Sequence, residues 1–583
     1  MLGARFVHVN DAPAPDSRSA RRALSLDLAT SLIVTALCSF RVYRALDKPA
    51  LTGIDDENIT QIYGLNLAKG FGYVYTPHFE RVEGATSPLW VAIHAALYEL
   101  TAKPEPYVLL CSVVLCALAI FFSLRIARHV VAALALPPWA VWIPVVAIAA
   151  QPHYFHWTAV AMMDQGLWAA VMLGLMGVLM GHLGSEQERP RTSLLGVLLC
   201  ILGVLARPEA MLLMPAMVVI AAAIVAVNRG RGAALRILLP YAVALAVALV
   251  GLTSARVSYF GYPLPNTYYA KVSSNPVDNV ATGLRYVAEY LASNVVVLPG
   301  VLAAVLGLML GAPSLLASYR ARKPLSAAHG AMLLIGGTSC IVVATTIVEG
   351  GDHFPGFRMQ QPYAPLLAVA LLFYVPALAG WARLAANRAT TLAWTAAIAA
   401  STLVSSYAAF GVRKKDFIED FTLAVEGRRL GELLNGLRGR PSVGVLPAGG
   451  IAVTYQGRVV DLLGLNWVAM AHASGRRTGI PGHSAFDLSV FWREPPAIVL
   501  PTILVDASYL HEKRTPSDYE LWVLHDLMNL PRFRQAYRPV YLHLAPSLVF
   551  AYASTDFIAK HRDDSRIESL DWERFRPGAP EAL

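Results

Sequence analysis

Long apolar runs recur through most of this chain, and they constrain its fold more than any other feature. Many approach the roughly 20 residues that an α-helix needs to cross a bilayer. Helices satisfy their own backbone hydrogen bonds in lipid, so the runs predict about eleven or twelve transmembrane helices. The predicted spans are Leu28–Leu46, Ser87–Leu100, Pro106–Ala127, Val130–Ala150, Gln165–Leu183, Ser193–Leu205, Pro208–Val227, Ala234–Tyr259, Val295–Leu310, Ala331–Val348, Pro362–Ala379 and Thr391–Phe410.

Composition excludes an ordinary soluble protein and disfavours a nucleic-acid partner. Hydrophobic residues make up 56% of the 583 positions and charged residues only 15%, and the mean hydropathy is +0.49. The net charge of +9 comes from short basic clusters between apolar runs, where the positive-inside rule places them. The five cysteines lie within apolar runs and lack metal-ligand spacing, so they predict neither a metal site nor a disulfide.

Charge also predicts the orientation and the domains. Residues 1–23 are polar and end in basic residues, which predicts a disordered cytoplasmic tail before a retained first span. Residues 24–410 then form the membrane domain, with its first loop, 47–87, outside the cytoplasm. The basic connectors on the cytoplasmic side are Glu188–Arg191, Arg229–Arg236, Arg320–Lys323 and Arg383–Arg388.

Residues 411–583 contain no plausible span and predict a soluble α/β domain on the extracytoplasmic side. A helix is expected from Asp416 to Leu437. Strand-like runs follow it, separated by the turn signals Gly449-Gly450 and Gln456-Gly457. The expected strands are Ser442–Leu446, Ile451–Tyr455, Val459–Leu463 and Ala497–Leu504.

The first polar loop is the best candidate for a catalytic element. It carries Asp55, Asp56 and Glu57 directly after a predicted span, where carboxylates are costly unless they face water, a cavity or a partner. These acids also begin an amphipathic helix, so one interpretation is that they only cap it. Capping and catalysis are compatible, and we predict that Asp55 is a base facing the membrane-side cavity while Asp56 caps the helix.

Further charged and aromatic residues lie in the segments predicted to face the same side. Singly, each has a simpler interpretation as a snorkelling, capping or solvated residue. Together they combine carboxylates for proton abstraction, cations for a phosphate and aromatic rings for a sugar or lipid. They are Arg81 and Glu83, Asp164, Arg207 and Glu209, Tyr259, Phe260, Tyr262, Tyr268, Tyr269, Lys271, Asp352, His353 and Arg358.

These segments also resemble a known family. The ordered motifs IDD, ERVEGATSPLW, MMDQGLW, ARPEA, YFGYPLPNTYYAK, GGDHFPGFR and RVVDLLGLNWVAMAH run from Ile54 to His472. They resemble the GT-C polytopic membrane glycosyltransferases, most closely those related to terminal arabinofuranosyltransferases. The resemblance implies a GT-C-like fold in the bacterial plasma membrane. It also implies a polyprenyl-phosphoryl arabinofuranose donor and a glycan, lipid or protein acceptor outside the cytoplasm.

Carried onto this chain, the resemblance implies a role for each motif residue. Asp55 or Asp56 would activate the acceptor, and the other residues would bind the donor or line the site. The chain departs from the family in a shorter C-terminal domain and in having Asp164 where glutamate is usual. The donor and phosphate contacts would be Arg207, Lys271, His353 and Arg358, and the lining residues Glu83, Asp164, Tyr268 and Asp352.

Two alternatives to a transferase follow from the same features. Polytopic helices with buried charges also describe transporters, although paired Gly/Pro-broken segments in two halves are not evident. A non-enzymatic assembly or motility factor is the second alternative. No cofactor is predicted, and a divalent cation held by the loop acids is left open.

Overall fold

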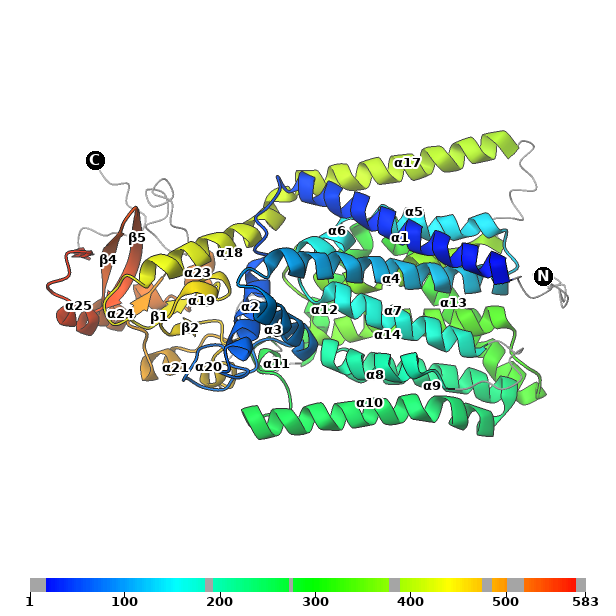
Figure 1. The fold of residues 1–583 in the computed structure, drawn as a ribbon, viewed down its shortest axis with the longest axis horizontal. Helices are drawn as coiled ribbons and strands as arrows, with labels where there is room; N and C mark the ends of the chain where they lie inside the picture. Colours follow the sequence, from blue (N-terminus) through cyan, green and yellow to red (C-terminus); the bar gives the residue numbers. More distant parts are fainter. Residues whose placement is uncertain are drawn as a thin grey trace.

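The computed structural model describes residues 17–183, 192–271, 276–376, 388–473, 485–500 and 518–572. Most helices run side by side along the long axis of the molecule, and a sheet domain lies beyond one end of them (Figure 1). The bundle helices are α1 (Ser17–Ala45), α4 (Glu105–Ala133), α5 (Trp142–Ala149), α7 (Gln165–Leu183), α8 (Leu194–Ala206), α9 (Ala210–Arg229), α10 (Arg231–Phe260), α13 (Val297–Ala321), α14 (Ala327–Glu349), α15 (Ala364–Ala370) and α17 (Arg388–Val412).

The bundle is built from helices that can cross a membrane. In the described ranges, seven helices are long and apolar enough, and three more apolar helices are shorter. A polytopic helical membrane protein is therefore confirmed, while the predicted count of eleven or twelve spans stays a prediction. The seven are Arg21–Ala45, Glu105–Ala133, Gln165–Leu183, Ala210–Arg229, Arg231–Phe260, Val297–Ala321 and Ala327–Glu349.

Four predicted spans differ from the structure. Ser87–Leu100 becomes α3 (Pro88–Leu100) and Ser193–Leu205 becomes α8, and the 13 residues of each rise only about 20 Å, too short for a bilayer. Val130–Ala150 is broken, because α4 ends at Ala133 and α5 begins only at Trp142, after two adjacent prolines that cannot continue a helix. Pro362–Ala379 is described only as short helical pieces up to residue 376.

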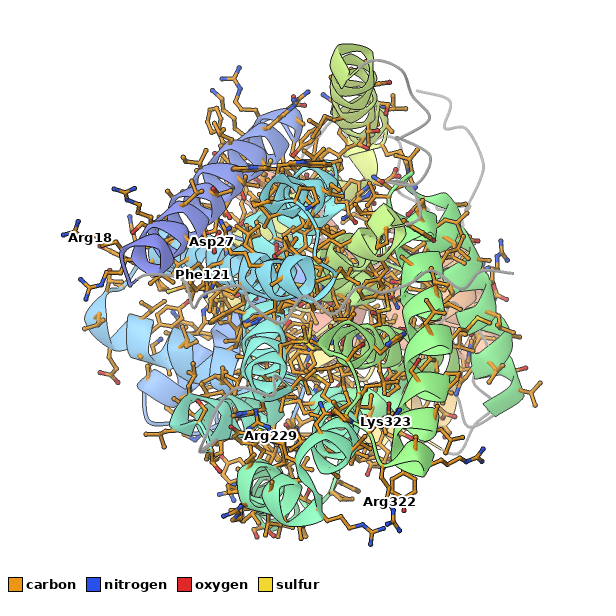
Figure 2. The ribbon with its side chains drawn as sticks, turned by 90° about the vertical axis from the view of Figure 1, so that its right-hand side faces the viewer. Arg18, Asp27, Phe121, Arg229, Arg322 and Lys323 are labelled. Atoms are coloured by element: carbon orange, nitrogen blue, oxygen red, sulfur yellow. The ribbon has the colours of Figure 1, made fainter. Side chains whose placement is uncertain are left out.

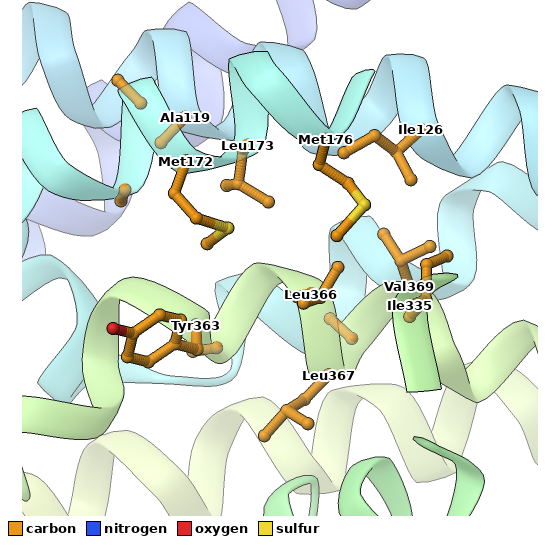
Figure 3. Close-up of a cluster of buried hydrophobic side chains, with 14 of the residues drawn as sticks. Ala119, Ile126, Met172, Leu173, Met176, Ile335, Tyr363, Leu366, Leu367 and Val369 are labelled. Carbon is orange, nitrogen blue, oxygen red and sulfur yellow. The ribbon is translucent and has the colours of Figure 1, made fainter. Parts of the chain in front are cut away.

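The bundle core is packed by long apolar side chains from several helices. Figure 3 shows Met172 and Met176 of α7 opposite Leu366 of α15. The Trp168 indole donates a hydrogen bond to the Tyr363 hydroxyl at 2.8 Å, just before α15 begins. These contacts hold the short segment 358–370 inside the bundle, and its first residue, Arg358, belongs to the site described below.

Further helices lie where the bundle meets the sheet domain (Figure 1). Of these, α2 begins at the predicted position and has Asp55, Asp56 and Glu57 in its first turn, where the helix dipole favours negative charge. The predicted helix is therefore confirmed, but its buried residues are polar and apolar alike, so it does not have the predicted amphipathic character. The junction helices are α2 (Asp55–Ala68), α3, α11 (Asn266–Lys271), α12 (Pro276–Ala292) and α18 (Lys414–Leu434).

The C-terminal region forms a six-stranded sheet in the order β2-β1-β3-β5-β4-β6. Strand β1 pairs in parallel with β2 and β3, whereas β5 pairs antiparallel with β3 and β4. The predicted α/β domain is confirmed. The strands are β1 (Val443–Val445), β2 (Val459–Asp461), β3 (Ile498–Val499), β4 (Tyr537–Leu544), β5 (Ser547–Ser554) and β6 (Ile567–Ser569).

Short helices connect these strands. Residues 451–455 were predicted as a strand, but they belong to α19 and its C-terminal cap. The strand segment 501–504 lies outside the described residues. The short helices are α19 (Gly450–Thr454), α20 (Val468–Ala471), α21 (Leu488–Arg493), α23 (Asp518–Val523), α24 (Pro531–Ala536) and α25 (Thr555–Lys560).

Candidate active site

A buried arginine joins two of the predicted loops. The Arg358 Nε donates to Asp352 at 2.7 Å, and its Nη1 donates to Asp56 at 2.9 Å. The guanidinium carbon lies 3.9 Å from the centre of the Phe354 ring, and Arg358 is only 8% exposed. The first polar loop and the 352–358 segment, about 300 residues apart in sequence, therefore form one site.

Strained backbone precedes two of the charged residues. Phe357, directly before Arg358, has a φ of 58°, and Met162, two residues before Asp164, has a φ of 65°. Bulky residues seldom adopt the left-handed region, and such strain concentrates at functional sites. Met162 also follows a π-helical turn, His156–Val160, another feature enriched at functional sites.

The cations around Asp56 keep it ionised. Burial raises the pKa of this carboxyl, but the positive charges of Lys271 and Arg358 outweigh burial and hold the pKa below its usual range. The Asp56 side chain is still 23% exposed, so a ligand can reach it. For Asp352, burial acts in the same way and is again outweighed, chiefly by Arg358, so its pKa is also lowered.

Lys271 faces the same group of charges from the end of α11. Burial lowers the pKa of its ammonium group, while the negative charges of Asp56 and Asp352 oppose that effect. In the described part of the chain, no carboxylate oxygen lies within the 4.0 Å of an ion pair from Lys271. Its ammonium group is therefore available to an anionic ligand. Nearby, burial lowers the pKa of His353 to about 4, so this side chain is neutral.

Arg207, a predicted phosphate contact, is already bound by two carboxylates. Its Nη1 donates to both Asp164 oxygens at 3.1 Å. Its Nε and Nη2 donate to Glu209 at 3.0 and 2.6 Å. The fork of the guanidinium is thus occupied. The charges of Arg207 and Asp164 act on the Arg358 cluster, but the guanidinium of Arg207 is already held between the two carboxylates.

Asp55 does not face the cavity. Its two oxygens accept hydrogen bonds from the backbone N–H groups of Gly449 and Gly450, at 2.9 and 2.8 Å. A side chain at Gly449 would collide with the Asp55 carbonyl oxygen, only 1.8 Å from an added Cβ. Asp55 therefore ties α2 to the sheet domain. The prediction that Asp56 caps the helix is also wrong, because Ile54 is the N-cap and no side chain caps it.

The contribution of the Asp55 contact with Gly449 and Gly450 to protein stability should depend on pH. Burial raises the pKa of Asp55 to about 6, with the two backbone hydrogen bonds opposing it. The folded protein binds this proton more tightly than the unfolded chain, so the stabilisation is complete below pH about 4 and is lost as pH rises through about 6. Between pH 4 and 7, the wild type should lose on the order of 2–3 kcal/mol relative to Asp55→Asn.

Thermal unfolding of the two proteins in detergent at each pH measures this difference. Asp47→Asn is the control, because the Asp47 side chain is 65% exposed. An identical pH profile for wild type and Asp55→Asn would contradict the prediction.

Two predicted lining residues do not belong to this cluster. Glu83 forms a bidentate ion pair with Arg256 of α10, at 2.8 to 3.0 Å, and both side chains are buried. Tyr268 is 46% exposed and contacts the Tyr269 ring edge-on at 5.6 Å. Glu83 therefore fixes the first loop to the bundle.

Sequence inspection missed one acidic residue near Asp56. Burial, followed by the charges of Asp56 and Asp55, raises the pKa of Asp420 well above its usual range. Asp420 lies on α18 between Phe417 and Phe421, which are both buried. The sequence could have indicated Asp420, because position 420 lies on the same helix face as Phe417 and Phe421, where an acidic residue is unexpected.

Glu57 and His94 form a second buried pair that the sequence did not reveal. Glu57 Oε1 lies 2.6 Å from His94 Nε2, and both side chains are fully buried. Burial raises the pKa of Glu57 and lowers that of His94 to about 3. His94 is therefore neutral, and the Trp90 indole of α3, which donates to the other Glu57 oxygen at 3.2 Å, joins the first turn of α2 to α3.

An apolar groove of about 330 Å³ is lined by Met162 and Phe421. Each of them is next in sequence to a residue that acts on the charged cluster. The sulfur of Met163 lies 3.7 Å from Arg358 Nη1, and Asp420 adjoins Phe421. Other lining residues are Phe40, Tyr43, Leu51 and Val113.

Comparisons with known proteins find a likeness only among solved structures. No family model and no curated protein matches the chain. ArnT from Cupriavidus metallidurans bound to undecaprenyl phosphate is 17% identical, with a TM-score of 0.47, over 90% of this chain and 98% of that one. Its apo state is 15% identical, with a TM-score of 0.43, over 92% and 99%. At these values the likeness carries no conclusion about the chemistry of this chain.

Proposed function

We propose that this protein is an integral membrane glycosyltransferase that moves a sugar from a lipid phosphate to an acceptor. The observation that carries the proposal is that the apolar groove is lined by Met162, whose neighbour Met163 contacts Arg358 of the charged cluster. A polyprenyl phosphate is a long apolar chain ending in an anion. The apolar groove suits the polyprenyl chain of the lipid. Lys271 suits the phosphate, because its ammonium group faces the charged cluster and has no carboxylate partner among the described residues of the protein.

Residues next to one another in sequence connect the two regions. Met162 lines the groove, and the sulfur of Met163 touches Arg358. Phe421 lines the groove, and burial together with the charge of Asp56 raises the pKa of neighbouring Asp420. A lipid lying in the groove would thus bring its head group to Asp56, Arg358 and Lys271.

In the proposed reaction, Asp56 takes the proton from the acceptor hydroxyl. The acceptor oxygen bonds to the anomeric carbon as the bond from that carbon to the phosphate oxygen breaks. The electron pair of the broken bond leaves with the polyprenyl phosphate, whose negative charge Lys271 neutralises. The lowered pKa of Asp56 keeps its carboxylate ionised before the transfer begins.

Arabinofuranose as the sugar, and the outer face of the membrane as the location, are parts of the same proposal. The sugar follows from the motif resemblance described above. For the location, Figure 2 shows Arg229, Arg322 and Lys323 at the end of the bundle opposite the sheet domain. If positive charge marks the cytoplasmic end, Asp56 and the sheet domain are extracytoplasmic. Acceptors are then glycans, lipids or proteins of the cell envelope.

Purified full-length protein, reconstituted with radiolabelled polyprenyl-phosphoryl arabinofuranose and cell-envelope acceptor, should release polyprenyl phosphate and label the acceptor. Polyprenyl-phosphoryl mannose serves as the comparison donor. Release of polyprenyl phosphate only from the mannose donor would mean that the transferred sugar is mannose and not arabinofuranose. Movement of an intact donor across the bilayer without release of polyprenyl phosphate would favour a transporter. Parallel reactions with EDTA test whether a divalent cation takes part.

A further inference from the structure

Helix α12 has three different faces along its length. One face is buried against the protein and carries Tyr286, Val287 and Tyr290. A second face is polar, and Arg285 and Glu289 form an exposed ion pair on it at 3.0 Å. The third face is apolar and exposed, and its residues recur every three or four positions, so they share one side of the helix. This apolar stripe consists of Val277, Val280, Ala281, Leu284 and Ala288.

The position of α12 is set by the ends of two candidate membrane spans. A Cβ added to Gly283 would lie 2.2 Å from the Ile347 carbonyl oxygen, so the backbones of α12 and α14 touch there. Ile347 belongs to the last turn of the span Ala327–Glu349, and the span Val297–Ala321 begins shortly after α12 ends. The exposed side chains of α12 therefore lie at the level where the membrane-spanning segments meet water.

We propose that α12 lies in the lipid–water interface, with its apolar stripe against the acyl chains of the membrane and with Arg285 and Glu289 facing water. An amphipathic helix binds a membrane in this way, because its apolar face is buried at the boundary between acyl chains and head groups. Leu284 is 53% exposed, so its side chain is open to such a contact. Exposed apolar side chains continue along the adjoining span at Leu298 and Leu302, and the lipid that surrounds this span can also cover α12.

The buried face of α12 contacts the segment that carries Arg358. The centre of the Phe357 ring lies 5.3 Å from that of Tyr286 and 5.5 Å from that of Tyr290. A Cβ added to Gly351 would lie 2.5 Å from the Tyr286 ring, so the segment approaches α12 closely at both of its ends. Phe357, whose φ is 58°, directly precedes Arg358, and its strained backbone needs support from its neighbours.

Lipid contact on one side of α12 thus supports Arg358 on the other side. Because Arg358 donates to Asp56, Leu284 becomes a positioning residue for the carboxylate that we propose as the base. This effect on catalysis rests on the function proposed above. The contact between α12 and lipid does not depend on that function.

Quenching by brominated lipid tests the lipid contact without requiring turnover. The full chain is placed in nanodiscs of phosphatidylglycerol and phosphatidylcholine whose acyl chains carry bromine. The fluorescent amino acid dansylalanine replaces Leu284 in one protein and Arg285, on the polar face, in the matched control. Neighbouring side chains on a helix point about 100° apart, so we expect quenching at position 284 to be at least about threefold stronger than at position 285.

Hydrogen exchange of residues 350–360, in the same nanodiscs without bromine, tests the positioning role. Leu284→Gln removes the apolar contact, so this segment should open more often and its amides should exchange roughly fivefold faster than in the wild type. Leu284→Met keeps the apolar contact and should exchange like the wild type, as should Arg285→Gln. The amides of β5 are the internal reference, because a local effect should leave them unchanged.

Absent quenching at position 284, or equal quenching at 284 and 285, would overturn the lipid contact. Unchanged exchange of residues 350–360 in Leu284→Gln, or equally faster exchange in β5, would overturn the positioning role. Quenching at position 284 in a protein that transfers no sugar would reject the transferase and keep the interfacial helix. Sugar transfer by a protein without this quenching would do the reverse.

Discussion

Replacing Asp56 by Asn is expected to lower the rate of sugar transfer by about two to four orders of magnitude, the usual contribution of a general base. Asparagine keeps the size of the side chain but cannot take the acceptor proton. It can still accept a hydrogen bond from Arg358, so the fold and the site should survive. Transfer of radiolabel under saturating donor measures the effect, and the donor affinity should change little.

Asp55→Asn is the matched control, one residue away on the same helix. The amide oxygen of the introduced asparagine can accept from one of the two glycine N–H groups, so turnover should stay within about tenfold of the wild type. If Asp55→Asn folds but does not turn over while Asp56→Asn is active, Asp55 is the general base. Full activity in both variants would mean that the first loop does not take part in catalysis.

Replacing Lys271 by Met is expected to weaken donor binding on the order of 30-fold, equivalent to about 2 kcal/mol for a charge-assisted contact. Methionine keeps most of the apolar stem and removes the charge. Because Lys271 has no ion-pair partner among the described residues, its loss leaves no buried carboxylate newly unpaired. Thermal stability should therefore be preserved, and the affinity for polyprenyl phosphate is the quantity to measure.

Arg207→Met and Lys103→Met are the comparisons. Arg207→Met leaves Asp164 and Glu209 buried without their cation, so it should destabilise the protein by about 3–5 kcal/mol. Any loss of donor affinity in this variant should therefore come with a loss of stability. Lys103 is exposed and lies outside the site, so its replacement should change neither property. Wild-type donor affinity in Lys271→Met would mean that this lysine does not contact the phosphate.

Sequence pattern predicted those parts of the fold that depend on local composition. Hydrophobic length identified the bundle helices, since a run of about 20 apolar residues is stable in lipid only as a helix. The first turn of α2 was predictable from its acids, and β1 and β2 from short β-branched runs. For residues 451–455 this kind of prediction was wrong. Their β-branched composition favours a strand, but the segment begins at the glycines that bind Asp55 and continues as a helix.

The sequence could suggest most residues of the site but not their partners. Successive residues of a helix point about 100° apart, so Asp55 and Asp56 must face different neighbours. Which one meets the sheet domain and which one meets Arg358 depends on how that domain docks against α2. The same holds for Arg207, whose carboxylate partner Asp164 comes from a different segment of the bundle.

The sequence by itself determined that this protein is a bundle of membrane helices with a polar domain after it, because hydrophobic length acts within each segment. Only the tertiary structure decided which charges are neutralised and which are available. Arg207 and Arg358 each pair with an acid nearby in sequence, Glu209 and Asp352, but their other partners, Asp164 and Asp56, come from distant segments. Pairing over hundreds of residues leaves Lys271 without a carboxylate partner in the described chain, since an ion pair needs contact in space and not proximity along the chain.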